Sequence, residues 1–160
     1  MNYGAMLKQF SFPKTKRLVS GRQFEAVLGR RLSASTGVLL LYMAENKCGY
    51  PRLGISVGKG CGGAVIRNRL KRVLREAFRQ SQGQIPPCFD YVLMVLSRRL
   101  KNYSPLQAKE KNGGVKTPPY RTSLQAKEAA KKSVKQLNLV DVQKWFLILV
   151  NKITDELKNQ

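Results

Sequence analysis

Residues 64–79 read AVIRNRLKRVLREAFR, and this stretch is the most informative part of the chain. Apolar side chains recur at positions 66, 70, 73, 74 and 77, which is the spacing of one buried face of an α-helix. The rest of the helix surface carries one acid, Glu76, and six basic residues: Arg67, Arg69, Lys71, Arg72, Arg75 and Arg79. Like charges at this spacing repel one another. The pattern therefore indicates an anionic partner, with nucleic-acid phosphate as the leading candidate.

The segment before this helix is a glycine-rich loop that follows a predicted strand, Arg52–Val57. Gly58, Gly60 and Gly63 match the spacing G-x-G-x-x-G of a dinucleotide-binding turn. The acidic residue expected after the next strand is missing, because Asp90 precedes that strand. We therefore interpret the loop as an entry turn and predict no nucleotide cofactor. Its backbone N–H groups, with Lys59, could still hold a nucleic-acid phosphate at the helix N-terminus.

Further elements follow from local periodicity and from turn residues. Strand-like apolar runs alternate with helix-like segments, and an extra strand could hide in the first apolar region. A sheet with helices on one side is the natural way to bury such elements. The predicted strands besides Arg52–Val57 are Gly37–Met43 and Tyr91–Leu96, and the predicted helices besides the basic one are Gln23–Leu32 and Val140–Leu157.

The composition changes after Ser97, where basic residues, glycines and prolines accumulate. Such a stretch has too few apolar residues to form a packed core of its own. We therefore predict a flexible N-terminal segment at 1–13, a core RNA-binding domain at 14–97, and a C-terminal helix at 138–160 that packs on the core. Between the last two lies a basic insertion, 98–137, which is largely flexible with a possible helix at 123–137.

The whole chain is strongly basic. Its 160 residues hold 30 Lys and Arg against 9 Asp and Glu, for a formal net charge of +21. Nucleic acid is therefore a more plausible partner than an acidic protein or a membrane, and a surface kept only for solubility would mix both signs. No apolar run reaches the roughly 18 residues of a membrane span, and the N-terminus lacks the apolar block of a secretory signal. We expect a cytoplasmic protein with no membrane partner.

No catalytic or metal-binding constellation stands out. The chain has no histidine, which excludes the usual zinc sites and histidine acid–base chemistry. Cys48, Cys61 and Cys88 are too widely spaced to suggest a zinc site or a disulfide framework. The acids are scattered singly apart from Asp155 and Glu156. We predict no catalytic residue and no metal site in the protein itself.

The segment Arg52–Phe78 closely resembles the protein subunit of bacterial ribonuclease P. The resemblance extends upstream to Arg17, Phe24 and Val27, and downstream to Asp90–Leu93, so that it covers about residues 14–97. The motifs that carry it are Gly54-Ile55-Ser56-Val57, Lys59, Gly62, Ala64-Val65, Arg67-Asn68-Arg69, Lys71-Arg72 and Arg75-Glu76-Ala77-Phe78.

This resemblance implies an α+β fold with the element order α-β-β-β-α-β-α. The family's fold is a two-layer sandwich, ribosomal protein S5 domain 2-like, and its basic helix lies in a left-handed β-α-β crossover. That handedness is implied by the family alone, since β-α-β crossovers are otherwise almost always right-handed.

The resemblance also implies a function. Such a protein is the accessory subunit of an endoribonuclease that removes the 5′ leader of precursor tRNA, so its partners are ribonuclease P RNA and precursor tRNA. Catalysis is expected to reside in the RNA, with Mg²⁺ held mainly by that RNA. The leader-binding cleft would include Phe24 and Tyr42. The residues expected to bind the catalytic RNA are Lys59, Arg67, Asn68, Arg69, Lys71, Arg72 and Arg75.

The chain departs from the family pattern at three places. Gly60 and Gly63 replace a lysine and an asparagine that the family's loop usually carries, and Leu28 replaces a second aromatic residue that often follows Phe24. The residues alone also leave an alternative open: a general structured-RNA-binding or ribosome-associated basic protein without a processing role.

Overall fold

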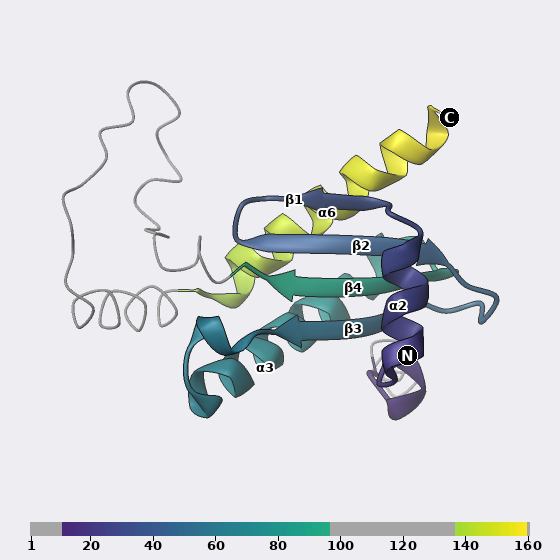
Figure 1. Cartoon of the computed structure of the whole chain (residues 1–160). Coiled ribbons are helices and arrows are strands. Elements are labelled where there is room, and N and C mark those ends of the chain that lie inside the picture. Colours follow the sequence, from purple (N-terminus) through teal and green to yellow (C-terminus); the bar gives the residue numbers. More distant parts are fainter. Residues whose placement is uncertain (1–10, 97–136, 160) are drawn as a thin grey trace, which may run out of the picture.

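A computed structural model describes residues 11–96 and 137–159 (Figure 1). The described part is one four-stranded sheet with helices packed on it. The strands are β1 (Ser33–Ser35), β2 (Leu39–Glu45), β3 (Arg52–Val57) and β4 (Phe89–Val95), and the α-helices are α2 (Gly21–Gly29), α3 (Ala64–Ser81) and α6 (Leu139–Lys158). Short 3-10 turns stand at Lys14–Lys16 (η1), Lys59–Cys61 (η2) and Gln82–Gln84 (η3).

The strands lie in the order β1-β2-β4-β3. β4 is central: it pairs antiparallel with β2, from Leu39 opposite Val95 to Glu45 opposite Phe89, and parallel with β3. The parallel pair needs a crossover, which α3 provides. In Figure 1 both strands point the same way, β4 lies above β3, and α3 crosses behind the sheet, so the connection is left-handed.

The larger core lies between one face of the sheet and the helices α3 and α6. Its centre is an aromatic triangle of Phe78, Tyr91 and Phe146, whose ring centroids are 5.8–5.9 Å apart. The three rings are fully buried, and they come from α3, β4 and α6 in turn. Ring contacts of this kind stabilise a core beyond the burial of their area. They fix the basic helix and the C-terminal helix on the same side of the sheet.

Helix α2 packs on the opposite face of the sheet, in front of β2 and β4 in Figure 1. Val27 of α2 joins Leu18, Ala44 and Val92 in a second, smaller core cluster. The start of this helix is a capping box, in which Ser20 Oγ accepts from the Gln23 N–H and the Gln23 side chain accepts from the Ser20 N–H. The cap fixes where α2 begins and therefore where its later residues meet the sheet.

The structure confirms the α+β fold, the element order and the left-handed crossover. The hidden strand is β1, which pairs antiparallel with β2. The expectation that the helices lie on one side of the sheet holds for α3 and α6. It is wrong for α2, which covers part of the other face, because Val27 has apolar partners there. The insertion and its possible helix lie almost entirely outside the described residues. The predicted domain boundaries stay predictions.

Candidate nucleic-acid interface

Helix α3 separates apolar and basic residues as its sequence predicts. Leu70, Leu74, Ala77 and Phe78 are buried, and they hold the helix on the core. Arg67 and Lys71 are half-buried at the flank of this stripe. The outer surface carries Asn68, Arg69, Arg72 and Arg75, all of them exposed, and the first turn adds the exposed side chains of Ala64 and Val65. We call the predicted RNA-binding residues of α3, positions 67–69, 71, 72 and 75, the basic face.

The sixth cation of α3, Arg79, is engaged within the helix. Its Nε donates to Glu76 Oε2 at 2.9 Å, and its Nη2 donates to Oε1. Gln80 Nε2 also donates to Glu76 Oε1, at 2.8 Å. The hydrogen bond from Arg79 lowers the pKa of Glu76 to about 2, so the carboxylate stays charged well into the acidic range. The single acid of the helix thus neutralises Arg79 and leaves the charge of the basic face uncompensated by this carboxylate.

The glycine-rich loop forms the entry turn to α3. Lys59, exposed, opens the 3-10 turn η2, and Cys61 closes it with a buried side chain. Gly62 has φ +135, and a methyl group there would lie 2.9 Å from Ile66 Cδ1, so this position requires glycine. Gly63 is the N-cap of α3, and it supplies no side-chain cap. A side chain would be tolerated at this position, because its φ of −65 suits any residue and an added Cβ would meet open space.

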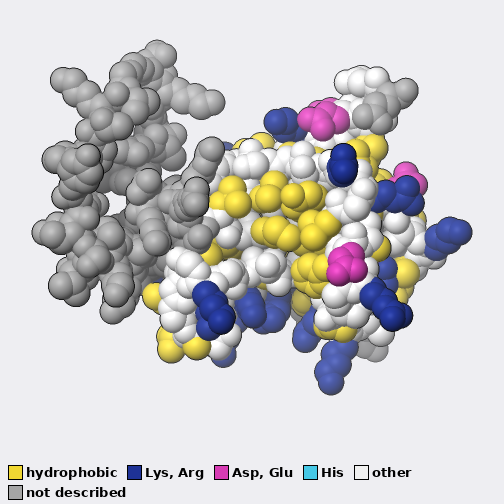
Figure 2. All heavy atoms as spheres, in the orientation of Figure 1, with side chains coloured by type: hydrophobic (Ala, Val, Ile, Leu, Met, Phe, Trp, Pro, Cys, Tyr) yellow, Lys and Arg dark blue, Asp and Glu magenta, His cyan; other side chains and the backbone are white. Residues whose placement is uncertain are grey.

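A second candidate surface lies on the other side of the sheet, beside α2. Phe24 and Tyr42 are half-buried there and pack on the small core cluster. Tyr42 sits opposite Val92 across β2 and β4, and Leu40 sits opposite Met94 on the same face. We call Leu40, Tyr42 and Met94 the open sheet face. Figure 2 shows a patch of hydrophobic side chains on this face of the molecule, beside α2.

The two groups of predicted residues therefore lie on different sides of the sheet. Phe24 and Tyr42 come together on the α2 side, and the basic face belongs to the α3 side. Edge strand β3 lies between them, because α3 packs on β3 from one side and the Phe24 ring lies against Gly54 of β3 on the other. Lys59 is placed where β3 leads into α3.

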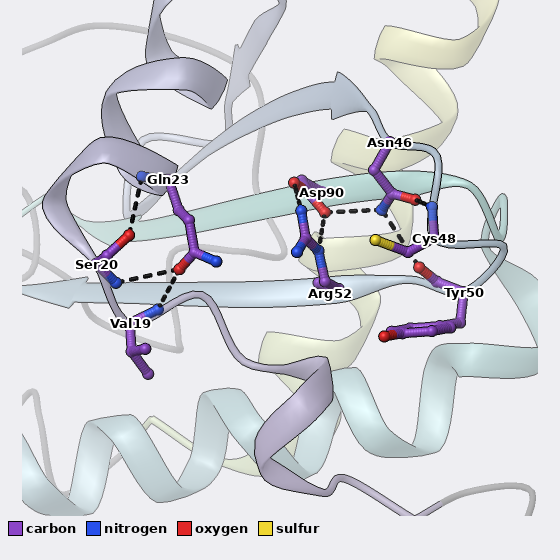
Figure 3. Close-up of polar contacts among 8 residues, drawn as sticks. All are labelled: Val19, Ser20, Gln23, Asn46, Cys48, Tyr50, Arg52 and Asp90. Carbon is purple, nitrogen blue, oxygen red and sulfur yellow. Dashed lines mark hydrogen bonds and ion pairs between the residues drawn. The ribbon is translucent and has the colours of Figure 1, made fainter.

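A partly buried ion pair near α2 was not foreseen from the sequence. Arg52 of β3 holds Asp90 of β4 through two hydrogen bonds, Nε to Oδ1 at 2.7 Å and Nη2 to Oδ2 at 2.6 Å (Figure 3). Asn46 Nδ2 donates to Asp90 Oδ1 at 2.7 Å and also bonds the Tyr50 carbonyl. The hydrogen bond to Asp90 raises the pKa of Arg52. The group ties the β2–β3 turn to the first residues of β4.

Within residues 11–96 and 137–159, which the structure describes, no group of three or more His, Cys, Asp or Glu side chains is placed to hold a metal ion. No helix in the same ranges has the length and apolar character needed to cross a bilayer.

Comparison with known proteins points to one family. A family model described as Ribonuclease P matches residues 12–115. The chain is 36% identical over 86 residues to the ribonuclease P protein component of Clostridium kluyveri, covering 54% of this chain and 77% of that protein. It is 40% identical over 83 residues to the ribonuclease P protein component of Shouchella clausii, covering 51% of this chain and 67% of that protein.

Solved structures agree with this result. The RNase P protein from Thermotoga maritima is similar with a TM-score of 0.50 and 32% identity, over 57% of this chain and 86% of that one. A mutant RNase P protein from Staphylococcus aureus is similar with a TM-score of 0.51 and 25% identity, over 83% of this chain and 93% of that one.

Proposed function

Because this chain belongs to the ribonuclease P protein family, whose members are accessory components of the endoribonuclease ribonuclease P, we propose that it binds RNA through two separate surfaces. The basic face of α3, together with Lys59, binds the catalytic ribonuclease P RNA. The open sheet face, together with Phe24, binds the single-stranded 5′ leader of precursor tRNA. Precursor tRNA is then the substrate of the complex formed by the protein and the catalytic RNA. We propose that this complex is located in the cytoplasm.

The uneven distribution of charge is the observation that carries this proposal. Helix α3 has six basic residues and one acid, whereas α6, on the same side of the sheet, has three of each. Arginine suits phosphate because its planar guanidinium donates two parallel hydrogen bonds. Neutralising several phosphates also releases counterions, which makes the binding strong at low salt and weak at high salt. The charge therefore selects α3, and not α6, as the RNA-binding helix.

The open sheet face has the chemistry needed for single-stranded RNA. Unpaired bases stack on aromatic side chains, and this contact tolerates any base because every base has a π-face. Phe24 and Tyr42 are half-buried, so each ring is held by apolar neighbours and keeps part of its surface accessible. Since a leader must be gripped without a fixed sequence, two such rings on one face are well suited to it.

We assign the chemical step to the RNA. Mg²⁺, held mainly by that RNA, would supply the activated water and the charge stabilisation that phosphodiester hydrolysis needs. The protein's part is binding: the basic face neutralises RNA phosphates, which lowers the concentration of Mg²⁺ that the folded RNA requires. The open sheet face holds the leader beside the site of cleavage.

Phe24→Ala tests the leader surface. We expect it to weaken binding of precursor tRNA to the reconstituted complex by about 5- to 150-fold, the range of one lost base–aromatic stack. Binding of mature tRNA, which has no leader, should change little. Equilibrium binding of both RNAs, measured side by side, gives the comparison.

Phe24→Leu separates stacking from packing, because leucine keeps apolar packing against Val27 and Val92 but offers no ring. If the leader stacks on Phe24, this variant should lose precursor affinity almost as much as the alanine variant. Equal losses for precursor and mature tRNA would instead make Phe24 a core residue only.

A further inference from the structure

Gly54 occupies the middle of β3, where glycine is an unfavourable choice. A glycine inside a strand is less stable than alanine by roughly 0.5–1 kcal/mol, because it loses more conformational freedom on folding. The backbone of Gly54 does not need glycine, because its φ is not positive. Among the described residues, the glycines with positive φ are Gly37, Gly49 and Gly62. Gly54 is also buried. The remaining reason for glycine here is the space above its Cα.

That space is filled by the ring of Phe24. A methyl carbon on Gly54 would lie 2.7 Å from Phe24 Cζ and 3.1 Å from both Cε1 and Cε2. The two Cε atoms are equally distant and only 0.4 Å farther than Cζ. If the methyl carbon instead lay in the plane of the ring, beyond Cζ, its distances to the two Cε atoms would exceed its distance to Cζ by a wider margin. The ring therefore lies with one face against Gly54, near its Cζ edge.

The rest of the surroundings hold the ring in this pose. Phe24 is one turn from the capping box that fixes the start of α2, and it packs on the cluster of Leu18, Val27 and Val92. Val92 is the neighbour of Gly54 across β3 and β4, and Tyr42 is the neighbour of Val92 across β4 and β2. Gly54, Val92 and Tyr42 thus form one row under α2, with the Phe24 ring at the β3 end of the row.

We propose that Gly54 is a positioning residue for leader binding: its bare Cα lets the Phe24 ring lie flat on β3, so that the opposite ring face is turned away from the strand toward a leader base. This inference rests on the leader surface proposed above. The clash produced by a methyl group involves the ring of Phe24, which supplies all three of the nearest heavy atoms. Since carbon atoms pack at about 3.5–4.0 Å, the ring must move by roughly 1 Å while the strand keeps its place.

The test is Gly54→Ala in the complex reconstituted from the full chain and ribonuclease P RNA. We expect precursor tRNA to bind about 5- to 30-fold more weakly, a large part of one stacking contact, and mature tRNA to bind as before. Gly29→Ala is the matched control, because Gly29 is also on α2's side of the sheet and an added methyl there meets open space. It should leave both affinities unchanged.

A double-mutant cycle with Phe24→Ala separates positioning from a general structural effect. With the ring removed, Gly54→Ala should cause no further loss of precursor affinity. A loss that persists in this background, or an equal loss for mature tRNA, would overturn the positioning role. If Gly54→Ala alone does not fold, the double variant must recover cooperative unfolding, and its failure to do so would count against the proposal.

The two proposals can fail separately. If Phe24→Ala loses precursor affinity selectively and Gly54→Ala does not, the leader surface stands and the role of Gly54 falls. If Phe24→Ala shows no selectivity for the precursor, the leader surface itself is wrong, and the role of Gly54 falls with it.

Discussion

Replacing Arg69, Arg72 and Arg75 together with alanine is expected to weaken binding of ribonuclease P RNA by roughly 100-fold at low salt. All three side chains are exposed on the outer surface of α3, and alanine is a good helix former, so the fold should be kept. Each phosphate contact contributes about 0.7–0.9 to the slope of log affinity against log salt. The slope should therefore fall by roughly 2 to 3, as measured by titrations at several salt concentrations.

The matched control removes three positive charges from α6, with Lys144, Lys152 and Lys158 changed to alanine. These side chains are also exposed and also lie on a long helix, but α6 has as many acids as bases. We expect a much smaller change in affinity, through the lower net charge alone. Similar losses for the two variants would mean that the net charge of the chain, and not the basic face, binds the RNA.

Asp90→Ala is expected to lower the free energy of unfolding by about 3 kcal/mol, the low end for breaking a buried ion pair. Asp90 is only 7% exposed, and it accepts hydrogen bonds from Arg52 and Asn46. Removing the carboxylate leaves the Arg52 guanidinium, with 21% of its side chain exposed, without its anionic partner. Urea unfolding followed by circular dichroism measures the change.

Asp155→Ala serves as the comparison, since Asp155 is exposed on α6 and a surface substitution usually changes stability by no more than about 0.5 kcal/mol. A similarly small change for Asp90→Ala would show that the Arg52–Asp90 pair adds little to stability. In that case backbone pairing and core packing would account for the position of β4 beside the β2–β3 turn.

The segment from Arg52 to Ser81 was predictable because its signals are local. Alternating residues give β3, the glycines give the turn, and the 3.6-residue period gives α3 with its buried stripe. Strand β1 was only suspected, because Ser33–Ser35 is short and largely polar, and it becomes a strand through pairing with β2. The spacing of apolar residues in α2 shows that it packs on something, but it does not show on which face.

The candidate site divides in the same way. The charges of α3 are visible in the sequence, since neighbours on a helix are three and four residues apart. The pairing of Arg52 with Asp90 joins residues 38 positions apart, and the contact of Phe24 with Gly54 joins two different elements. Both depend on the register of β3 against β4 and on the placement of α2. No local pattern reports either of these, so only the folded chain reveals them.

The most direct test is reconstitution with the cognate ribonuclease P RNA. Cleavage of precursor tRNA is measured at low Mg²⁺ with the RNA alone, with the protein alone, and with both together. We predict that neither component alone cleaves appreciably, and that the mixture releases the 5′ leader at the mature end of the tRNA. The proposed function would be contradicted if, at low Mg²⁺, the catalytic RNA cleaved precursor tRNA no faster with this chain than without it.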